Sequence, residues 1–390
     1  MNRRPALPCG DDRLPMLRLG STDVPGAAGL SDLEKRDVVL AAGGTAGHVE
    51  PALNLAETLT TINDGLRISV LGGRRGLENM LVPARGLPID TFDAVPLPRS
   101  LSWSDLKRCA QVIRATWQAR QLLRRQQPAV VVGFGGYVAA PVYLAAWSLR
   151  IPIIVHEANA RPGIANRLGA RLTRHVVTAA EPNLPHAQAL GIPLNPAISG
   201  LDRASQRGIA RAALGLPNEG TVLLVFGGSQ GAQRLNEALR GALPTLLASG
   251  ISVLHAVGRS NPLPEARPGY HPVAYLDQMA QAYAAADLAV TRAGALTCAE
   301  LAAVGMPAVY VPLAIGNGEQ RLNALPAVQV GGGVLLDDAQ CTADTMQSQV
   351  LELVQSSGRL ELMSRAVRGI GHRDGSQALA ALVLTVMKHQ

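Results

Sequence analysis

Short runs of Val, Ile and Leu alternate with longer amphipathic segments along most of the chain. In two places an apolar run, at 38–42 and at 222–226, precedes a glycine-rich turn: Gly43-Gly44-Thr45-Ala46-Gly47-His48 and Gly227-Gly228-Ser229-Gln230-Gly231. Apolar residues then recur at helical spacing, so each segment is predicted to be a strand, a glycine turn and a helix. Further apolar runs lie at 68–71, 130–132, 153–155, 253–257, 288–290 and 309–311. This alternation predicts an α/β fold of two doubly wound, Rossmann-like domains with parallel sheets.

The length of 390 residues accommodates two to three domains at about 150 residues each. Prolines at 193 and 196 interrupt both periods, so we expect the domains to join there. The predicted organisation is a poorly ordered extension at 1–36, an N-terminal domain at 37–195, a C-terminal domain at 196–371 and a final helix at 372–390 that packs back on the N-terminal domain. Ligands of such folds bind beyond the carboxyl ends of the strands. Two facing domains would therefore place both glycine turns on one cleft.

Composition narrows the classes of function. The net charge of +7 favours an anionic partner, yet only 17% of residues are charged and 47% are hydrophobic, which is typical of a packed globular protein. The four cysteines are scattered and form no Cys-x-x-Cys pair, so neither a disulfide framework nor a zinc site is indicated. Aromatic residues make up 3% of the chain, too few to favour stacking on bases, and no nucleic-acid partner is expected.

Two segments bear on membrane association. Residues 126–149 carry no charge, which permits a transmembrane span by length, but Pro128, Gly135 and Pro141 interrupt them and favour a strand leading into a helix. Between residues 105 and 127 there are six Lys or Arg and one acid, accompanied by Trp103 and Trp117. This mixture suits an anionic membrane surface, and a solvated basic helix face explains it equally well.

A glycine turn that opens a helix presents backbone N–H groups at the positive end of the helix dipole, where a phosphate can approach closely. Both turns qualify, although glycines also serve simply to pack a tight corner. Neither turn is Gly-x-Gly-x-x-Gly, and neither ends in Gly-Lys-Ser/Thr, which disfavours dinucleotide-binding and P-loop sites. His48 stands at the expected helix start, where the dipole favours the neutral imidazole that a general base requires. The alternative is a side chain that only bonds to its own loop.

Polar residues also follow the later strands. A third glycine turn ends at Tyr137, the strand at 153–155 continues into Glu157 and Asn159, and Glu300 lies in the first turn of a predicted helix. A carboxylate there can accept hydrogen bonds from a ribose diol, and it can equally close a capping box. A polar loop at 316–323 is expected on the same sheet edge.

These segments together resemble the MurG family of bacterial peptidoglycan glycosyltransferases, and the resemblance covers nearly everything after residue 36. The matching motifs lie at 43–48, 133–137, 156–159, 227–232, 294–300 and 319–323. The resemblance implies a GT-B fold and inverting transfer of N-acetylglucosamine from UDP to the 4-hydroxyl of undecaprenyl-diphospho-N-acetylmuramyl-pentapeptide, the step from lipid I to lipid II. It also implies an enzyme docked peripherally on the anionic inner leaflet of the cell membrane, near the cell-wall and division machinery.

The resemblance implies roles for matched positions. His48 is the expected catalytic base, and acceptor binding is expected at His48, Tyr137 and Glu157. The donor-binding positions that it implies are Thr45, Ala46, Gly47, Asn159, Asn195, Ser229, Gln230, Leu276, Ala295, Leu296, Thr297, Cys298, Ala299, Glu300 and Gln320. Among these, Ser229 and Gln230 would bind the UDP phosphates, and Glu300 the ribose. Family members usually carry Arg where this chain has Asn195, which cannot pair with the diphosphate as a cation.

The expected chemistry is an in-line displacement at the anomeric carbon, with UDP leaving against backbone N–H groups and the helix dipole. The scheme calls for no cofactor and no metal, and no Asp-x-Asp is placed to hold Mg²⁺ on the diphosphate. Two alternatives stay open at this point. One is a UDP-N-acetylglucosamine 2-epimerase on the same architecture, and the other is a non-catalytic scaffold that binds the UDP-sugar.

Overall fold

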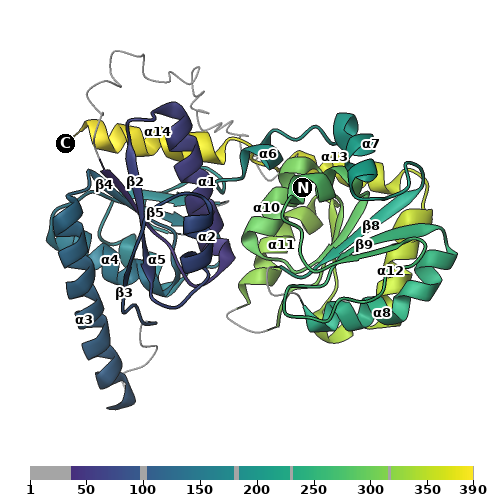
Figure 1. Ribbon diagram of the computed structural model, residues 1–390, viewed down its shortest axis with the longest axis horizontal. Helices are drawn as coiled ribbons and strands as arrows, with labels where there is room; N and C mark the ends of the chain where they lie inside the picture. Colours follow the sequence, from purple (N-terminus) through teal and green to yellow (C-terminus); the bar gives the residue numbers. More distant parts are fainter. Residues whose placement is uncertain (1–36, 97–102, 180–183, 229–231, 315–317, 390) are drawn as a thin grey trace, which may run out of the picture.

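Two α/β domains lie side by side in the computed structural model, which describes residues 37–96, 103–179, 184–228, 232–314 and 318–389 (Figure 1). Within the segment that begins at 103, side chains are described from residue 108 onward. Each domain is built on one parallel sheet, so the predicted fold class is confirmed.

The N-terminal domain contains a seven-stranded sheet in the order β3-β2-β1-β4-β5-β6-β7, in which every neighbouring pair is parallel. Its strands are β1 (Asp37–Ala41), β2 (Arg67–Gly73), β3 (Ile89–Phe92), β4 (Val130–Gly133), β5 (Ile153–Glu157), β6 (His175–Thr178) and β7 (Ala187–Ala189). Its helices are α1 (Ala46–Ile62), α2 (Glu78–Ala84), α3 (Trp103–Gln126), α4 (Gly136–Ser148) and α5 (Ile164–Gly169). The central strands read as unbroken apolar runs because helices bury both faces of the sheet.

The C-terminal domain contains a six-stranded parallel sheet in the order β10-β9-β8-β11-β12-β13. Its strands are β8 (Thr221–Phe226), β9 (Ile251–Ala256), β10 (Tyr270–Val273), β11 (Leu288–Thr291), β12 (Ala308–Tyr310) and β13 (Gly333–Leu335). Its helical elements are α6 (Pro196–Ser199), α7 (Arg203–Ala213), α8 (Gln233–Ala248), α9 (Met279–Ala285), α10 (Ala295–Val304), α11 (Glu319–Gln329), the 3-10 helix η3 (Asp338–Gln340), α12 (Ala343–Gln355) and α13 (Arg359–Arg368). In both sheets the strand order reverses beside the strand that precedes the glycine turn, β1 or β8.

The last helix, α14 (Gly375–Lys388), crosses back to the N-terminal domain and lies against α1 (Figure 1). Leu379, Ala380 and Val383 of α14 are fully buried in the same cluster as Val38 and Leu40 of β1. The apolar face of α14 therefore completes the core of a domain that lies far from it in sequence.

The uncharged stretch at 126–149 divides into β4 and α4, both of which are mostly buried in the N-terminal core. Across the described segments, the structure contains no helix both long and apolar enough to span a bilayer.

Candidate active site

A cavity of about 1540 Å³ lies between the two domains, at the carboxyl ends of both sheets. Parallel α/β sheets bind ligands at this edge, because glycine turns and helix N-termini gather there. The predicted site residues that line the cavity are Thr45, Ala46, Gly47, His48, Asn159, Asn195, Leu276, Ala295, Leu296, Thr297, Glu300 and Gln320. The fold thus brings together positions that lie up to 275 residues apart in the sequence.

His48 lies in the first turn of α1, and its imidazole is half-buried. Its Nδ1 is 3.0 Å from the Thr45 hydroxyl oxygen. Burial lowers the pKa of His48 below its usual 6.5, against the opposing charges of Glu157, Glu319 and Glu78. The imidazole is therefore neutral at pH 7, as a general base requires. The third glycine turn packs against the first: a Cβ on Gly136 would lie only 2.6 Å from the carbonyl oxygen of Gly43, next to the His48 ring.

Glu157 does not line the cavity, because the backbone and Asn side chains behind the cavity wall engage its carboxylate. Its oxygens accept hydrogen bonds from the backbone N–H groups of Asn159 and Gly163, both at 2.9 Å, and from the Asn166 amide at 3.0 Å. The side chain is 2% exposed. In this structure Glu157 holds Asn159, whose side chain does line the cavity.

Tyr137 also lies behind the cavity wall. Its hydroxyl is 2.5 Å from the carbonyl oxygen of Arg75 and 3.3 Å from Glu78 Oε1, and burial raises its pKa to about 12. Glu78, which the sequence analysis missed, is fully buried and accepts hydrogen bonds from the N–H groups of Gly44 and Gly73, both at 3.0 Å. The amide of Gly44 is thus taken by a carboxylate of the protein itself.

The second glycine turn opens onto the cavity. Gly227 and Gly228 line it, and Gly228 has a φ of +96° with no described atom within 4 Å of the Cβ position. Such a φ favours glycine and leaves the backbone accessible to a ligand. Ser229 and Gln230, predicted to bind the phosphates, lie outside the described residues.

The N-terminal turns of α10 form part of the cavity wall that the C-terminal domain contributes. Ala295, Leu296, Thr297 and Glu300 line the cavity there. Cys298 instead points into the core of the domain, where burial raises the pKa of its thiol. Ala299 packs in a small apolar cluster that joins the two domains. The helical period explains the division, because neighbouring residues of a helix face different directions.

Glu300 has an unusual electrostatic environment. Burial raises the pKa of its carboxyl to about 7, the Tyr283 hydroxyl at 2.8 Å opposes that rise, and the charge of Glu50 on α1 adds to it. Glu50 is paired with Arg85 at 3.1 Å, and both line the cavity with Tyr275 and Tyr283. No motif around these four residues marks them in the sequence, since only the fold brings them to the cleft.

The remaining predicted residues lie at the edges of the cavity. The Gln320 side chain accepts a hydrogen bond from the N–H group of Leu313 at 2.9 Å. Leu276 is 8% exposed, follows β10 and lines the cavity. Asn195 accepts from the N–H group of Ala197 at 2.9 Å and so forms the N-cap of α6. Within the ranges that the structure describes, no group of three or more His, Cys, Asp or Glu could hold a metal ion.

Two facing parallel-sheet domains around one cavity of this kind form the GT-B architecture of two-domain glycosyltransferases. The family models agree: the glycosyltransferase family 28 N-terminal domain matches residues 38–178, and the family 28 C-terminal domain matches residues 222–379. The chain belongs to glycosyltransferase family 28 and, within it, to the MurG family that the sequence resembles.

Individual relatives support this membership. Two of them are named UDP-N-acetylglucosamine--N-acetylmuramyl-(pentapeptide) pyrophosphoryl-undecaprenol N-acetylglucosamine transferase. The protein from Mycolicibacterium vanbaalenii is 51% identical over 90% of each chain. The protein from Acidothermus cellulolyticus is 52% identical over 89% of this chain and 96% of its own. The crystal structure of Acinetobacter baumannii MurG is 29% identical, with a TM-score of 0.72 over 90% of this chain and 99% of that one. The chain is accordingly a hexosyltransferase, as predicted.

Proposed function

We propose that this enzyme transfers N-acetylglucosamine from UDP-N-acetylglucosamine to the 4-hydroxyl of undecaprenyl-diphospho-N-acetylmuramyl-pentapeptide, completing lipid II for peptidoglycan synthesis. The observation that carries the proposal is the shared cavity, in which a neutral histidine from one domain faces a glycine turn and a carboxylate from the other. Its relatives at about 50% identity carry the name of this transfer.

The C-terminal domain, residues 196–371, is proposed to bind the donor. The glycine turn after β8 and the helix that follows it present backbone N–H groups suited to the diphosphate, with Ser229 and Gln230 as side-chain donors. Glu300, half-buried on the cavity wall, is proposed to accept hydrogen bonds from the ribose hydroxyls. Gln320 and Asn159 are proposed to hold the sugar hydroxyls from opposite sides of the cleft. In this arrangement the leaving group is held by one domain only.

The N-terminal domain, residues 37–195, is proposed to bind the acceptor beside His48. The acceptor 4-oxygen attacks the anomeric carbon, and its bond to that carbon forms as the bond to the β-phosphate oxygen breaks. The proton of the hydroxyl passes to the imidazole, and the electron pair of the broken bond leaves with UDP. When Nδ1 carries a proton and donates to Thr45, the free lone pair lies on Nε2, which is the atom that would accept the new proton.

The test is incorporation of radiolabel from UDP-N-acetylglucosamine into the lipid fraction, with and without the lipid-linked muramyl acceptor. The transferase proposal expects labelled lipid only when both substrates are present. A new hexosamine formed from the donor alone would instead identify an epimerase. Bound donor without any labelled lipid would identify a scaffold.

We further propose that α3 and α4 dock the enzyme on an anionic membrane surface. On α3, which projects from the N-terminal domain in Figure 1, Ile113 and Trp117 are 70% and 61% exposed and share one helix face with Arg120 and Arg124. Trp147 at the end of α4 is 60% exposed, next to Ser148, to which Arg120 donates a hydrogen bond. Aromatic side chains beside arginines suit a bilayer interface.

Docking there would locate the protein peripherally on the cytoplasmic side of the cell membrane. Its lipid-linked product is used for wall growth, so we expect the cell-wall and division machinery as neighbours. Co-sedimentation with phosphatidylglycerol vesicles tests the surface: Ile113→Glu with Trp117→Glu should abolish binding that phosphatidylcholine vesicles never support. Ile209→Glu, an equally exposed position on α7, is the matched control. Unchanged sedimentation of the double variant would refute docking through this face.

A further inference from the structure

Tyr283 links the donor pocket to the interior of the C-terminal domain. Its ring is fully buried on α9 and its hydroxyl donates to Glu300 Oε2 at 2.8 Å. The ring also meets Phe226, the last residue of β8, edge-on at 6.2 Å between centroids. Tyr283 therefore connects the strand that leads into the second glycine turn with the carboxylate proposed to bind ribose.

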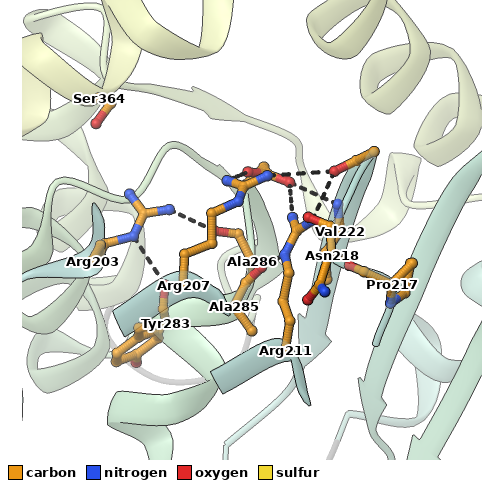
Figure 2. A network of polar contacts seen from close by, with 12 residues as sticks. Arg203, Arg207, Arg211, Pro217, Asn218, Val222, Tyr283, Ala285, Ala286 and Ser364 are labelled. Atoms are coloured by element: carbon orange, nitrogen blue, oxygen red, sulfur yellow. Dashed lines mark hydrogen bonds and ion pairs between the residues drawn. The ribbon is translucent and has the colours of Figure 1, made fainter. Parts of the chain in front are cut away.

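The backbone of Tyr283 is fixed in turn by Arg203 of α7. The Arg203 guanidinium donates to the carbonyl oxygens of Tyr283 at 2.9 Å and Ala286 at 2.5 Å (Figure 2), and also to that of Gly305 at 2.9 Å. These carbonyls lie at the carboxyl ends of α9 and α10, where a helix has no partners of its own for them. Burial lowers the pKa of Arg203 to about 10, so the group is still charged at neutral pH.

One guanidinium thus ties the end of α9 to the end of α10. Glu300 lies on α10, and the Tyr283 hydroxyl that donates to it lies on α9. The contacts of Arg203 with both helices therefore set the position of that hydroxyl relative to the Glu300 carboxylate. The neighbouring Arg211, labelled with Arg203 in Figure 2, has a fully buried side chain and pairs at 2.8 Å with the half-buried Asp287, which anchors α7 to the start of β11. These contacts of Arg203 fix the helix that carries Tyr283 against the helix that carries Glu300.

We propose that Tyr283 is a positioning residue for donor recognition: by holding one oxygen of Glu300, it presents the carboxylate in the orientation that accepts the ribose diol. This inference rests on the proposed function of the cavity as a UDP-sugar site. A carboxylate offers about four lone-pair positions. One hydrogen bond from Tyr283 therefore leaves enough of them for both ribose hydroxyls.

Several titratable groups face Glu300. Glu50 approaches from α1 of the opposite domain, Tyr275 from the loop after β10, and Tyr283 from α9, while Tyr310 of β12 and Cys298 of α10 interact electrostatically with Tyr283. Glu50 disfavours the charged carboxylate, and the Tyr283 hydroxyl favours it. Removal of that hydroxyl should raise the pKa of Glu300 above about 7, so that protonation begins at a higher pH.

The experiment compares the full-length wild type with Tyr283→Phe in calorimetric titrations of UDP and 2′-deoxy-UDP between pH 5.5 and 8.5. Tyr283→Phe should weaken the binding of UDP by about 3- to 10-fold, the range for one hydrogen bond. It should weaken the binding of 2′-deoxy-UDP less. The midpoint at which UDP affinity falls with decreasing pH should move to higher pH. Thermal unfolding of each variant shows that the fold is retained.

Tyr310→Phe is the matched control. Tyr310 is fully buried in the same core cluster, and its hydroxyl has no hydrogen-bond partner among the described residues. This variant should change neither the preference for UDP over 2′-deoxy-UDP nor the pH midpoint. If Tyr283→Phe weakens both nucleotides equally without moving the midpoint, or changes nothing, the positioning role is overturned while the UDP site stands. A wild type that binds no UDP would overturn the proposed function instead.

Discussion

The two glycine turns share one sequence pattern, yet their glycines serve different purposes. At the first turn a Cβ on Gly43 would lie 2.6 Å from Glu78 Oε1, and the N–H group of Gly44 donates to the same carboxylate. At the second turn Gly228 faces open space and lines the cavity. Gly43 makes room for a buried carboxylate of the protein and Gly44 for the Tyr137 ring, whereas the second turn leaves its backbone open to an anion from outside.

This difference indicates separate roles for the two turns in the cleft. Since Glu78 already occupies the Gly44 amide, the described cavity lining of the first turn begins at Thr45 and includes His48. The expectation that both turns cradle phosphate is therefore not matched at Gly43 and Gly44. We interpret the first turn as a rigid support for the residue that performs chemistry, and the second as the site that holds the leaving group.

The largest effect should come from His48→Ala. Loss of a general base lowers turnover by about 10²- to 10⁴-fold, with donor affinity nearly unchanged because the nucleotide is held by the other domain. In the wild type, turnover should be constant above pH 7 and fall as the pH drops through the lowered pKa of His48, beneath 6.5. Steady-state kinetics with the lipid acceptor measure both quantities, and a variant with near-normal turnover would remove His48 from its proposed role.

The next largest effect should be a loss of stability on removal of the buried Glu78 carboxylate. Glu78→Ala leaves the N–H groups of Gly44 and Gly73 without their acceptor, and should lower the free energy of unfolding by about 3 kcal/mol. Gly76→Ala should cost about 1–2 kcal/mol, because the three heavy atoms nearest the new Cβ all belong to Glu78.

Combining the two substitutions tests whether position 76 requires glycine because the Glu78 side chain lies against it. Gly76→Ala should cost almost nothing in the Glu78→Ala background, since the atoms that it meets are gone. Denaturant unfolding of the four proteins in the cycle measures the coupling. Additive losses would show that Gly76 is required for another reason.

Glu78 also marks the limit of prediction from sequence. The strands and both glycine turns follow from short-range apolar patterns and from where parallel strands end, whereas the resemblance to the MurG family implied the predicted residues that line the cavity. Glu78 and Tyr283 act through contacts with residues 34 and 17 positions away, at Gly44 and Glu300, and no local spacing encodes such contacts. For the same reason the sequence placed Glu157 at the acceptor, whereas the structure shows it bonded to the backbone behind the wall.

A smaller effect is expected at the second turn. Ser229→Ala should weaken UDP binding by about 10- to 100-fold through loss of one hydrogen bond to a charged phosphate, and leave turnover at saturating donor nearly unchanged. Calorimetric titration with UDP measures the affinity. Ser229→Ala should thus weaken UDP binding and leave turnover nearly unchanged, whereas His48→Ala should lower turnover and leave UDP binding nearly unchanged. Equal losses of turnover in both variants would contradict the division between the two turns.

The smallest effect should come from Asn195→Arg, which restores the residue usual in the family at the edge of the donor pocket. The amide oxygen of Asn195 caps α6, so its loss should lower the free energy of unfolding by about 1 kcal/mol. The added cation should strengthen UDP binding by about 3-fold, because a guanidinium pairs with phosphate across the cavity. Asn195→Ala separates the two effects, since it loses the same cap without gaining charge. If both variants bind UDP as the wild type does, the second turn holds the diphosphate without help from the domain junction.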